Sequence, residues 1–261
     1  MNKLPISVFI IAKNEADRIP TAILSVRDWV DEVHVVDSGS ADDTIRVSEA
    51  LGANTHSRAW TGYGPQKVHG ESLCRNDWLI NIDADEEISP ALRDEIQALF
   101  ATGPKHVAYT LPILPLYSFQ TRAHPWTAHH HPVRLYRMSC ARFKDSPVHD
   151  TVVVREGSIG HLRAMVNHRS FRSLTHHVDK LNFYSTAQAE DRFAKNREPS
   201  FLSLLLITPL AFLKAFILRR EFMNGMDGVV VSYMYAFQRF IRLAKTRERF
   251  QLARKQGKPR E

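Results

Sequence analysis

Short apolar segments alternate with helical segments over the first hundred residues, and this alternation constrains the fold more than any other feature of the chain. Three apolar, β-branched runs are typical of buried strands: residues 6–12, 33–36 and 78–82. Three segments of helical character follow them in turn: residues 19–30, 42–51 and 91–100. Strands that alternate with helices through short connections predict an α/β protein with a mostly parallel sheet flanked by helices.

A polar cluster follows each of the three predicted strands. The clusters are Lys13-Asn14-Glu15, Asp37-Ser38-Gly39-Ser40 and Asp83-Ala84-Asp85. One such cluster is a common turn or helix cap. Three at successive strand ends indicate a shared ligand site, because open α/β sheets bind ligands beyond the carboxyl ends of their strands.

Asp83 and Asp85 are two residues apart, so in extended backbone their side chains project to the same side. Two close carboxylates repel each other unless a cation lies between them. Oxygen ligands suit Mg²⁺ or Mn²⁺, which commonly also bind substrate phosphates and would neutralise a diphosphate leaving group. The chain has no Walker loop and no G-x-G-x-x-G after the first strand, which argues against a P-loop NTPase and a Rossmann dehydrogenase.

Three segments, SVFIIAKNEADRI, VHVVDSGSADDT and WLINIDADEEI, resemble the N-terminal half of inverting family 2 glycosyltransferases, which have the GT-A fold. IDADE matches their D-x-D element. The later Val148-His149-Asp150 and the tail from Phe212 resemble the lipopolysaccharide-core β-glucosyltransferase subgroup, whose members usually read VHE. Asp150 keeps the carboxylate with a reach that is one methylene shorter.

The resemblance implies a role for each candidate donor-site residue. Asn14, Glu15 and Asp37 would hold the nucleoside. Asp83 would contact the ribose or the metal, and Asp85 would bind the metal, Mg²⁺ or Mn²⁺. Lys67, in GYGPQKVHG, would pair with the diphosphate, with a solvated surface lysine as the alternative.

Inverting transfer requires a carboxylate that deprotonates the acceptor hydroxyl. Because a metal occupies the donor-site aspartate, the base must lie elsewhere. Asp150 is the candidate base, since it matches the VHE carboxylate, and Asp145 is its nearest rival. His149 and His168 are candidates to complete the metal shell or to contact an acidic acceptor. A zinc site at residues 129–131 is not expected, because consecutive residues of a strand cannot all face one ion.

The net charge of +7 belongs to the tail. From Arg219 onward the chain has eleven Lys or Arg and four Asp or Glu, so the first 218 residues sum to zero. Residues 201–218 are the most apolar stretch, interrupted by Pro209 and Lys214. This pattern favours a helix that lies in a membrane interface over a clean span, with a buried core helix as the alternative. Aromatic and basic residues beyond it suit an anionic membrane surface, and no nucleic-acid-binding motif accompanies them.

These features predict two regions. Residues 1–170 would form a GT-A nucleotide-sugar-binding and catalytic domain, and residues 171–261 a helical, basic, membrane-associating region. Two cysteines and the lack of a secretory signal favour a reducing compartment. The expected location is peripheral, on the cytoplasmic face of the inner membrane.

The predicted function is inverting transfer of a single hexose, from UDP-glucose or a similar nucleotide sugar, to a glycolipid such as lipopolysaccharide or lipooligosaccharide core. The Q-x-x-R-W motif of processive synthases is missing, which favours transfer of one sugar. One alternative is a sugar-phosphate nucleotidyltransferase, but the Gly-rich basic loop that is normal there is lacking. The other is a non-catalytic, membrane-recruited nucleotide-sugar-binding module, against which the intact Asp83 and Asp85 argue.

Overall fold

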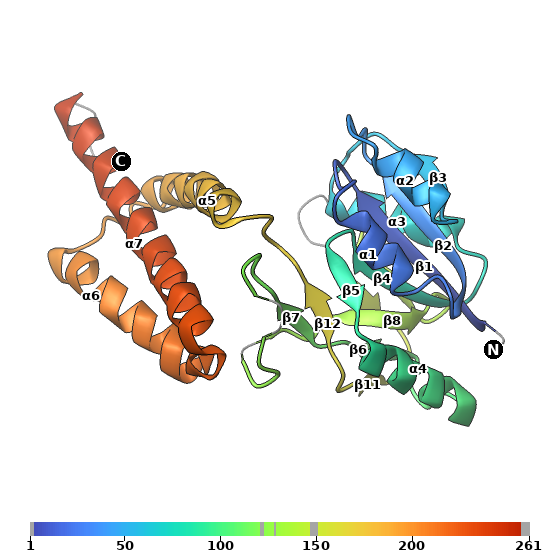
Figure 1. Cartoon of the computed structure of the whole chain (residues 1–261). Helices are drawn as coiled ribbons and strands as arrows, with labels where there is room; N and C mark the ends of the chain where they lie inside the picture. Colours follow the sequence, from blue (N-terminus) through green and yellow to red (C-terminus); the bar gives the residue numbers. More distant parts are fainter. Residues whose placement is uncertain (1–2, 121–122, 128, 147–150, 257–261) are drawn as a thin grey trace. The chain divides into compact units, whose positions relative to one another are not determined.

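The computed structural model describes residues 3–120, 123–127, 129–146 and 151–256 (Figure 1). The chain forms two compact units. The sheet unit contains the residues up to Pro115 together with His129–Arg169, and the helical unit contains residues 116–128 and those from Ser170 onward. The chain therefore passes between the units three times.

A seven-stranded sheet forms the centre of the sheet unit. Its strands are β1 (Leu4–Ala12), β2 (Val30–Asp37), β3 (Asn54–Ser57), β4 (Trp78–Asp83), β6 (Ala108–Thr110), β8 (Val133–Arg137) and β11 (Ile159–His161), in the order β11-β6-β8-β4-β1-β2-β3. Only β8 among these described strands runs antiparallel to its neighbours. The predicted α/β class with a mostly parallel sheet and a C-terminal helical extension is confirmed.

Both faces of the central strands are buried. Ile6, Val8 and Ile10 of β1 pack into one apolar cluster, and the intervening Phe9 packs into a second one with Leu79. This burial on two sides explains why the strand sequences are continuous apolar runs rather than alternating ones. The helices of the sheet unit are α1 (Ile19–Leu24), α2 (Thr44–Ala50), α3 (Tyr63–Leu73) and α4 (Pro90–Thr102).

Helix α3 was not predicted from the sequence, because Gly64, Pro65 and Gly70 are poor helix formers. Its glycines permit close packing instead. A Cβ atom at Gly70 would lie 2.4 Å from Cδ2 of the fully buried Phe9 on β1. Contact with the sheet therefore selects a residue that intrinsic helix propensity disfavours.

Two small sheets complete this unit. Strands β5 (Glu86–Ile88), β12 (Val166–His168) and β7 (Ile113–Pro115) form one, with β12 antiparallel to β5 and parallel to β7. Their register places His168 opposite Glu86, immediately after Asp85. Strands β9 (Ala141–Phe143) and β10 (Val152–Val154) form an antiparallel pair.

The helical unit consists of α5 (Leu174–Ala194), α6 (Phe201–Leu213), the π-helical turn η1 (Lys214–Leu218), the 3₁₀ turn η2 (Glu221–Asn224) and α7 (Gly225–Lys255). Helices α5 and α6 both pack along α7 (Figure 1). Lys245 fastens α7 to α5, since its Nζ donates to the Asn182 carbonyl at 2.8 Å and to Ser185 Oγ at 2.9 Å. The division of roles between residues 1–170 and 171–261 stays a prediction.

Within the described residues, one stretch is long and apolar enough to cross a membrane. It runs from Phe201 to Leu218 with a mean hydropathy of 2.3, and only 11% of it is buried. A core helix would bury its apolar side chains, so the core-helix alternative is wrong for this stretch.

Replacing Gly70 with alanine tests the close approach of α3 to β1. The helix gains up to about 1 kcal/mol in propensity, but overlap with the Phe9 ring costs about 1–3 kcal/mol. We expect a net loss in the free energy of unfolding, measured by urea denaturation. The variant Phe9→Leu should recover stability in the Gly70→Ala background; no recovery would contradict the packing argument.

His177 gives the helical unit a pH-dependent stability. Its ring stacks on Phe171 at a centroid distance of 3.8 Å and lies 5.3 Å from the Tyr117 ring. Burial, and then the charges of Lys180 and His176, lower the pKa of His177 to about 4. Because the unfolded chain takes up this proton first, stability is lost as the pH falls from 6.5 towards 4.

We expect wild-type protein to lose about 2 kcal/mol of unfolding free energy through this group between roughly pH 7.5 and pH 5. His177→Phe keeps the stacked ring and removes the titration. Its loss of unfolding free energy between the two pH values should therefore be smaller than that of the wild type by about 2 kcal/mol. Denaturation at both pH values measures the difference, and equal losses would refute it.

Candidate active site

The sheet brings the three predicted polar clusters to one edge. Strand β1 pairs with β2 and β4, with Ala12 opposite Asp37 and Ile11 opposite Asp83. All three strands run parallel, so their carboxyl ends coincide. The edge therefore carries the loops after β1, β2 and β4, as the strand-end argument predicted.

Asn14 and Asp37 join the first two loops to each other. The buried Asp37 carboxylate accepts hydrogen bonds from the Gly39 and Ser40 amides at 2.8 and 2.9 Å. Ser40 Oγ in turn accepts from the amide of Asn14 at 2.8 Å. Asn14 adopts a left-handed backbone with φ of 56°, and its Oδ1 accepts from the Ala41 amide at 2.7 Å. Both side chains shape this rim, and their contact with a nucleoside stays a prediction.

Asp83 lies between two cations. Lys67 Nζ is 3.1 Å from its Oδ1, and Arg134 Nη2 donates to its Oδ2 at 3.1 Å. The side chain of Lys67 is only 1% exposed, so the alternative of a solvated surface lysine is wrong. Burial raises the pKa of Asp83, but the charges of Lys67 and Arg134 outweigh it and hold that pKa well below its usual range. Asp83 is therefore an anion at neutral pH.

Arg134 is held in place on several sides. Its guanidinium donates to Asn81 Oδ1 at 2.5 Å and to Glu86 Oε1 at 3.0 Å, while Glu86 Oε2 accepts from the Asp83 amide at 2.8 Å. Burial raises the pKa of Glu86. This network ties the loop after β4 to β8 and fixes the direction of the Asp83 carboxylate.

Asp85 has different partners. Arg18 Nη1 donates to its Oδ2 at 3.0 Å, and His168 Nε2 lies 3.3 Å from its Oδ1. Burial raises the pKa of Asp85, but the hydrogen bond from His168 and the positive charges of His168 and Arg18 lower it below its ordinary value. Burial lowers the pKa of His168, and its bond to Asp85 raises it above 6.5 on balance.

Glu15 belongs to the same group through Arg18, whose Nε and Nη2 donate to its carboxylate at 2.7 and 2.6 Å. The loops after β1 and β4 are thus bridged by one guanidinium. The nucleoside-binding role predicted for Glu15 stays a prediction.

The donors around Asp85 suit a divalent metal. A carboxylate oxygen and an imidazole nitrogen stand 3.3 Å apart on Asp85 and His168, and both ligand types bind Mn²⁺, with oxygen preferred by Mg²⁺. No group of three or more His, Cys, Asp or Glu side chains is arranged around an ion in the part of the chain that the structure describes. The remaining ligands would then be substrate phosphates and water. Asp83 is paired with Lys67 and Arg134 as Asp85 is with Arg18 and His168, and no histidine contact of the kind that His168 makes with Asp85 occurs at Asp83 among the described ion pairs.

Asp150 lies outside the described residues, as does His149. The rival base, Asp145, is exposed. Its segment packs on the start of α3, where the Gly64 amide donates to the Ser146 carbonyl at 3.1 Å. A Cβ atom at Gly64 would lie 2.4 Å from that oxygen. Residues 144–146 are therefore anchored on the helix that carries Lys67.

Arg18 and Arg134 were missed from the sequence. Arg134 interrupts the apolar run VRLYR, and a cation inside a buried strand implies a carboxylate partner. Arg18 follows Glu15 by three residues, a spacing that permits an ion pair in a helical turn. His168 was proposed for the metal shell, and the structure places it beside Asp85.

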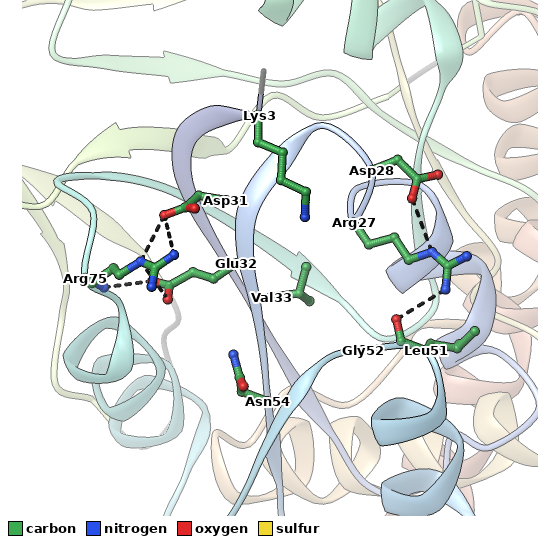
Figure 2. Close-up of a pocket in the computed structure, with 10 residues that line it drawn as sticks. All are labelled: Lys3, Arg27, Asp28, Asp31, Glu32, Val33, Leu51, Gly52, Asn54 and Arg75. Carbon is green, nitrogen blue, oxygen red and sulfur yellow. Dashed lines mark hydrogen bonds and ion pairs between the residues drawn. The ribbon is translucent and has the colours of Figure 1, made fainter. Parts of the chain in front are cut away.

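A polar pocket of about 410 Å³ lies at the opposite, amino ends of β2 and β3 (Figure 2). Its two arginines pair with groups of the pocket itself: Arg75 Nη2 is 2.8 Å from Asp31, and Arg27 Nη1 donates to the Leu51 carbonyl at 3.2 Å. The pocket contains none of the predicted site residues.

An open α/β sheet with carboxylates and cations gathered at the carboxyl ends of its strands has a ligand site where such sheets bind their ligands. The chain belongs to glycosyl transferase family 2, because the family's sequence profile matches residues 7–154. It is a glycosyltransferase, and the predicted family is confirmed.

Two relatives match nearly the whole chain. A glycosyltransferase of Rickettsia bellii (strain RML369-C) is 42% identical over 253 residues, covering 93% of this chain and 86% of the relative. The lipopolysaccharide core biosynthesis glycosyltransferase LpsC of Rhizobium meliloti (strain 1021) is 29% identical over 266 residues, covering 96% of this chain and 94% of LpsC.

Solved structures show looser similarity. Glucosyl-3-phosphoglycerate synthase from Mycobacterium tuberculosis, in complex with Mn²⁺ and UDP-glucose, is 28% identical over 43% of each chain with a TM-score of 0.34. S. aureus TarS 1–349 is 13% identical, covers 97% of this chain and 92% of its own, and has a TM-score of 0.49.

Replacing Asp85 with asparagine tests the metal assignment. The amide keeps the size of the side chain and removes the charge that a divalent ion requires. We expect the Mn²⁺-dependent part of UDP binding to vanish in calorimetry, with little change in circular dichroism. Asp94→Asn is the control, because that carboxylate is exposed, pairs with Arg93 and belongs to α4 rather than to the loops after β1, β2 and β4. Unchanged UDP affinity in Asp85→Asn would exclude Asp85 as a metal ligand.

Proposed function

We propose that this glycosyltransferase moves a single hexose, with inversion, from UDP-glucose or a similar nucleotide sugar to a glycolipid acceptor of the lipopolysaccharide or lipooligosaccharide core type. Family membership supports the nucleotide-sugar donor. The similarity to LpsC over 96% of the chain supports the acceptor. The observation that carries the proposal is the sheet edge at which Asp83 and Asp85 stand beside fixed cations.

The two carboxylates of the D-x-D element have separate roles in this proposal. Asp85, with His168, would hold Mg²⁺ or Mn²⁺, which when bound neutralises charge on the leaving diphosphate. Asp83 keeps its charge through Lys67 and Arg134 and is directed to the ribose. The nucleoside lies against the rim made by Asn14, Glu15 and Asp37.

Lys67 supports the leaving group electrostatically. Its ammonium lies 3.1 Å from Asp83 and 5.2 Å from the centre of the Phe143 ring. These two contacts hold the ammonium in place beside the carboxyl ends of the strands. A fixed cation beside a departing diphosphate stabilises the charge that develops as the bond breaks.

Asp150 is the proposed base. It takes the proton of the acceptor hydroxyl while that oxygen attacks the anomeric carbon, and the bond from that carbon to the diphosphate oxygen breaks on the opposite side. The anchoring of residues 144–146 on α3 supports this choice, because it brings the preceding segment to the helix of Lys67. Asp145 remains the alternative.

The proposed site of action is the cytoplasmic face of the inner membrane, where a nucleotide sugar and a lipid-borne acceptor meet. The exposed apolar helix supports peripheral attachment there. Family membership sets aside the sugar-phosphate nucleotidyltransferase. The non-catalytic binding module differs from the enzyme in one measurable respect, since it would bind the donor without turnover. We propose no nucleic-acid partner.

A panel of nucleotide sugars with extracted core glycolipid tests the function directly. We expect transfer of one hexose from one donor, and nuclear magnetic resonance of the product should give an anomeric configuration opposite to that of the donor. Donor binding without transfer to any core acceptor would refute the proposed activity.

The variants Asp150→Asn and Asp145→Asn form a matched pair for the base. We expect Asp150→Asn to lower kcat about a hundredfold or more with donor affinity nearly intact, as loss of a general base does. Asp145→Asn should stay within a few-fold of wild type. The reverse pattern would assign the base to Asp145.

A further inference from the structure

Helices α6 and α7 each carry a row of exposed apolar side chains. Along α6 and η1 the exposed large side chains are Phe201, Leu202, Leu205, Leu206, Leu210, Leu213, Ile217 and Leu218. Along α7 they are Met226, Val230, Tyr233, Phe237 and Phe240, at alternating spacings of four and three. The two helices pack side by side (Figure 1), so the two stripes belong to one helical hairpin.

The two stripes together are called the hairpin face below, and water solvates such an exposed apolar surface poorly. Leu202, Leu210 and Met226 are 63%, 59% and 80% exposed. Soluble monomers rarely expose contiguous apolar patches of more than a few hundred Å², and larger ones mark interaction sites. Among residues 201–218, Ala211 and Ala215 are the buried ones, in a segment whose elements α6 and η1 both contact α7.

Cations accompany the hairpin face. Lys214 lies within the α6 stripe, one turn from Leu210 and Leu218, where its stem can lie along apolar surface with the ammonium in the headgroup layer. Arg219 and Arg239 lie over the ring of Tyr235, at 4.8 and 4.9 Å from its centre, and Tyr235 is about 200° around α7 from Tyr233, so this pair of cations flanks the stripe from the other side of the helix. Amphipathic aromatic rings with cations are typical of the boundary between headgroups and acyl chains.

A cavity at the turn of the hairpin adds a polar contact. It has a volume of about 540 Å³ and is lined by Trp126, Arg220, Phe222 and Met223. Trp126 is 64% exposed, and its loop is tied to the turn by the His124 amide, which donates to Asn224 Oδ1 at 2.7 Å. An arginine among three apolar side chains suits a phosphate group attached to a lipid.

Arg220 adopts a left-handed backbone with φ of 61°, a conformation that favours glycine or asparagine. No ion pair of Arg220 occurs among the described residues. A strained backbone that presents a cation to a cavity is consistent with a functional constraint.

We propose that the hairpin face lies in the plane of an anionic membrane, inserted into one leaflet, with Arg220 on a lipid phosphate in the Trp126 cavity. The apolar stripes supply a contribution that salt does not remove. The surplus of seven positive charges beyond residue 218 supplies one that salt screens. The inference rests on the proposed function for the lipid-borne acceptor, and it specifies how the enzyme reaches that acceptor.

The variants Leu213→Glu and Leu24→Glu test the surface. They make the same substitution at leucines that are 48% and 47% exposed, one on the hairpin face and one at the end of α1. We expect the full-length protein to sediment with vesicles of phosphatidylcholine and about one third phosphatidylglycerol. Leu213→Glu should lower the partition coefficient about tenfold or more, because it places a charge in the apolar layer. Leu24→Glu should leave it unchanged, and equal losses would overturn the proposal.

Arg220→Asn tests the lipid phosphate, because asparagine tolerates the left-handed backbone and carries no charge. We expect about fivefold weaker binding to the anionic vesicles and no change on pure phosphatidylcholine. Tryptophan emission should shift to shorter wavelength on vesicle binding, and Trp126→Phe should remove that shift. An equal loss of binding on both vesicle types, or an emission shift that persists in Trp126→Phe, would show that the cavity does not contact the membrane.

Two further outcomes contradict in-plane insertion. A dimer in sedimentation equilibrium that Leu213→Glu dissociates, together with no vesicle binding, would assign the face to a second copy of the chain. Membrane protein that resists alkaline carbonate would indicate a span. UDP binding by calorimetry on the same preparations separates the proposals: intact UDP binding without vesicle binding overturns only the membrane inference, and the reverse overturns only the donor site.

Discussion

The ion network around Asp83 is the interaction on which both the fold and the site depend. Three elements contribute to it: α3 through Lys67, β8 through Arg134, and β4 through Asp83 itself. Removing charged groups from water is expensive unless they meet in good geometry. The network is therefore stable only when the helix, the parallel strand and the antiparallel strand have all assembled. A change at any of its members alters the sheet edge and the donor position together.

Local patterns predicted much of this structure. Strands β1, β2 and β4 follow from their apolar runs. Helix α3 was not predicted because its glycines disfavour helix formation. The reason for Gly70 is its close contact with Phe9, which is far away in the sequence. Arg134 and His168 reach the site through antiparallel pairing of β8 with β4 and of β12 with β5. Such partners are set by tertiary topology, which no local spacing encodes.

The helical unit shows a different limit of sequence reasoning. Composition identified residues 201–218 as apolar, but the same composition fits a core helix. Only the packing distinguishes them, because Ala211 of α6 and Ala215 of η1 are buried, whereas most leucines of the stretch are exposed. Hydropathy thus indicates how much apolar surface exists, and tertiary contacts decide where it lies.

The hydrogen bond between His124 and Asn224 has a consequence for biosynthesis. It joins residues that are 100 positions apart. At ribosomal rates of about 5–20 residues per second, the segment around Trp126 waits roughly 5–20 s for its partner. The sheet unit's last strand, β12, leaves the ribosome during that interval, whereas the leucine-rich hairpin emerges near the end of translation. The order of synthesis thus shortens the time for which the most aggregation-prone surface of the nascent chain is exposed.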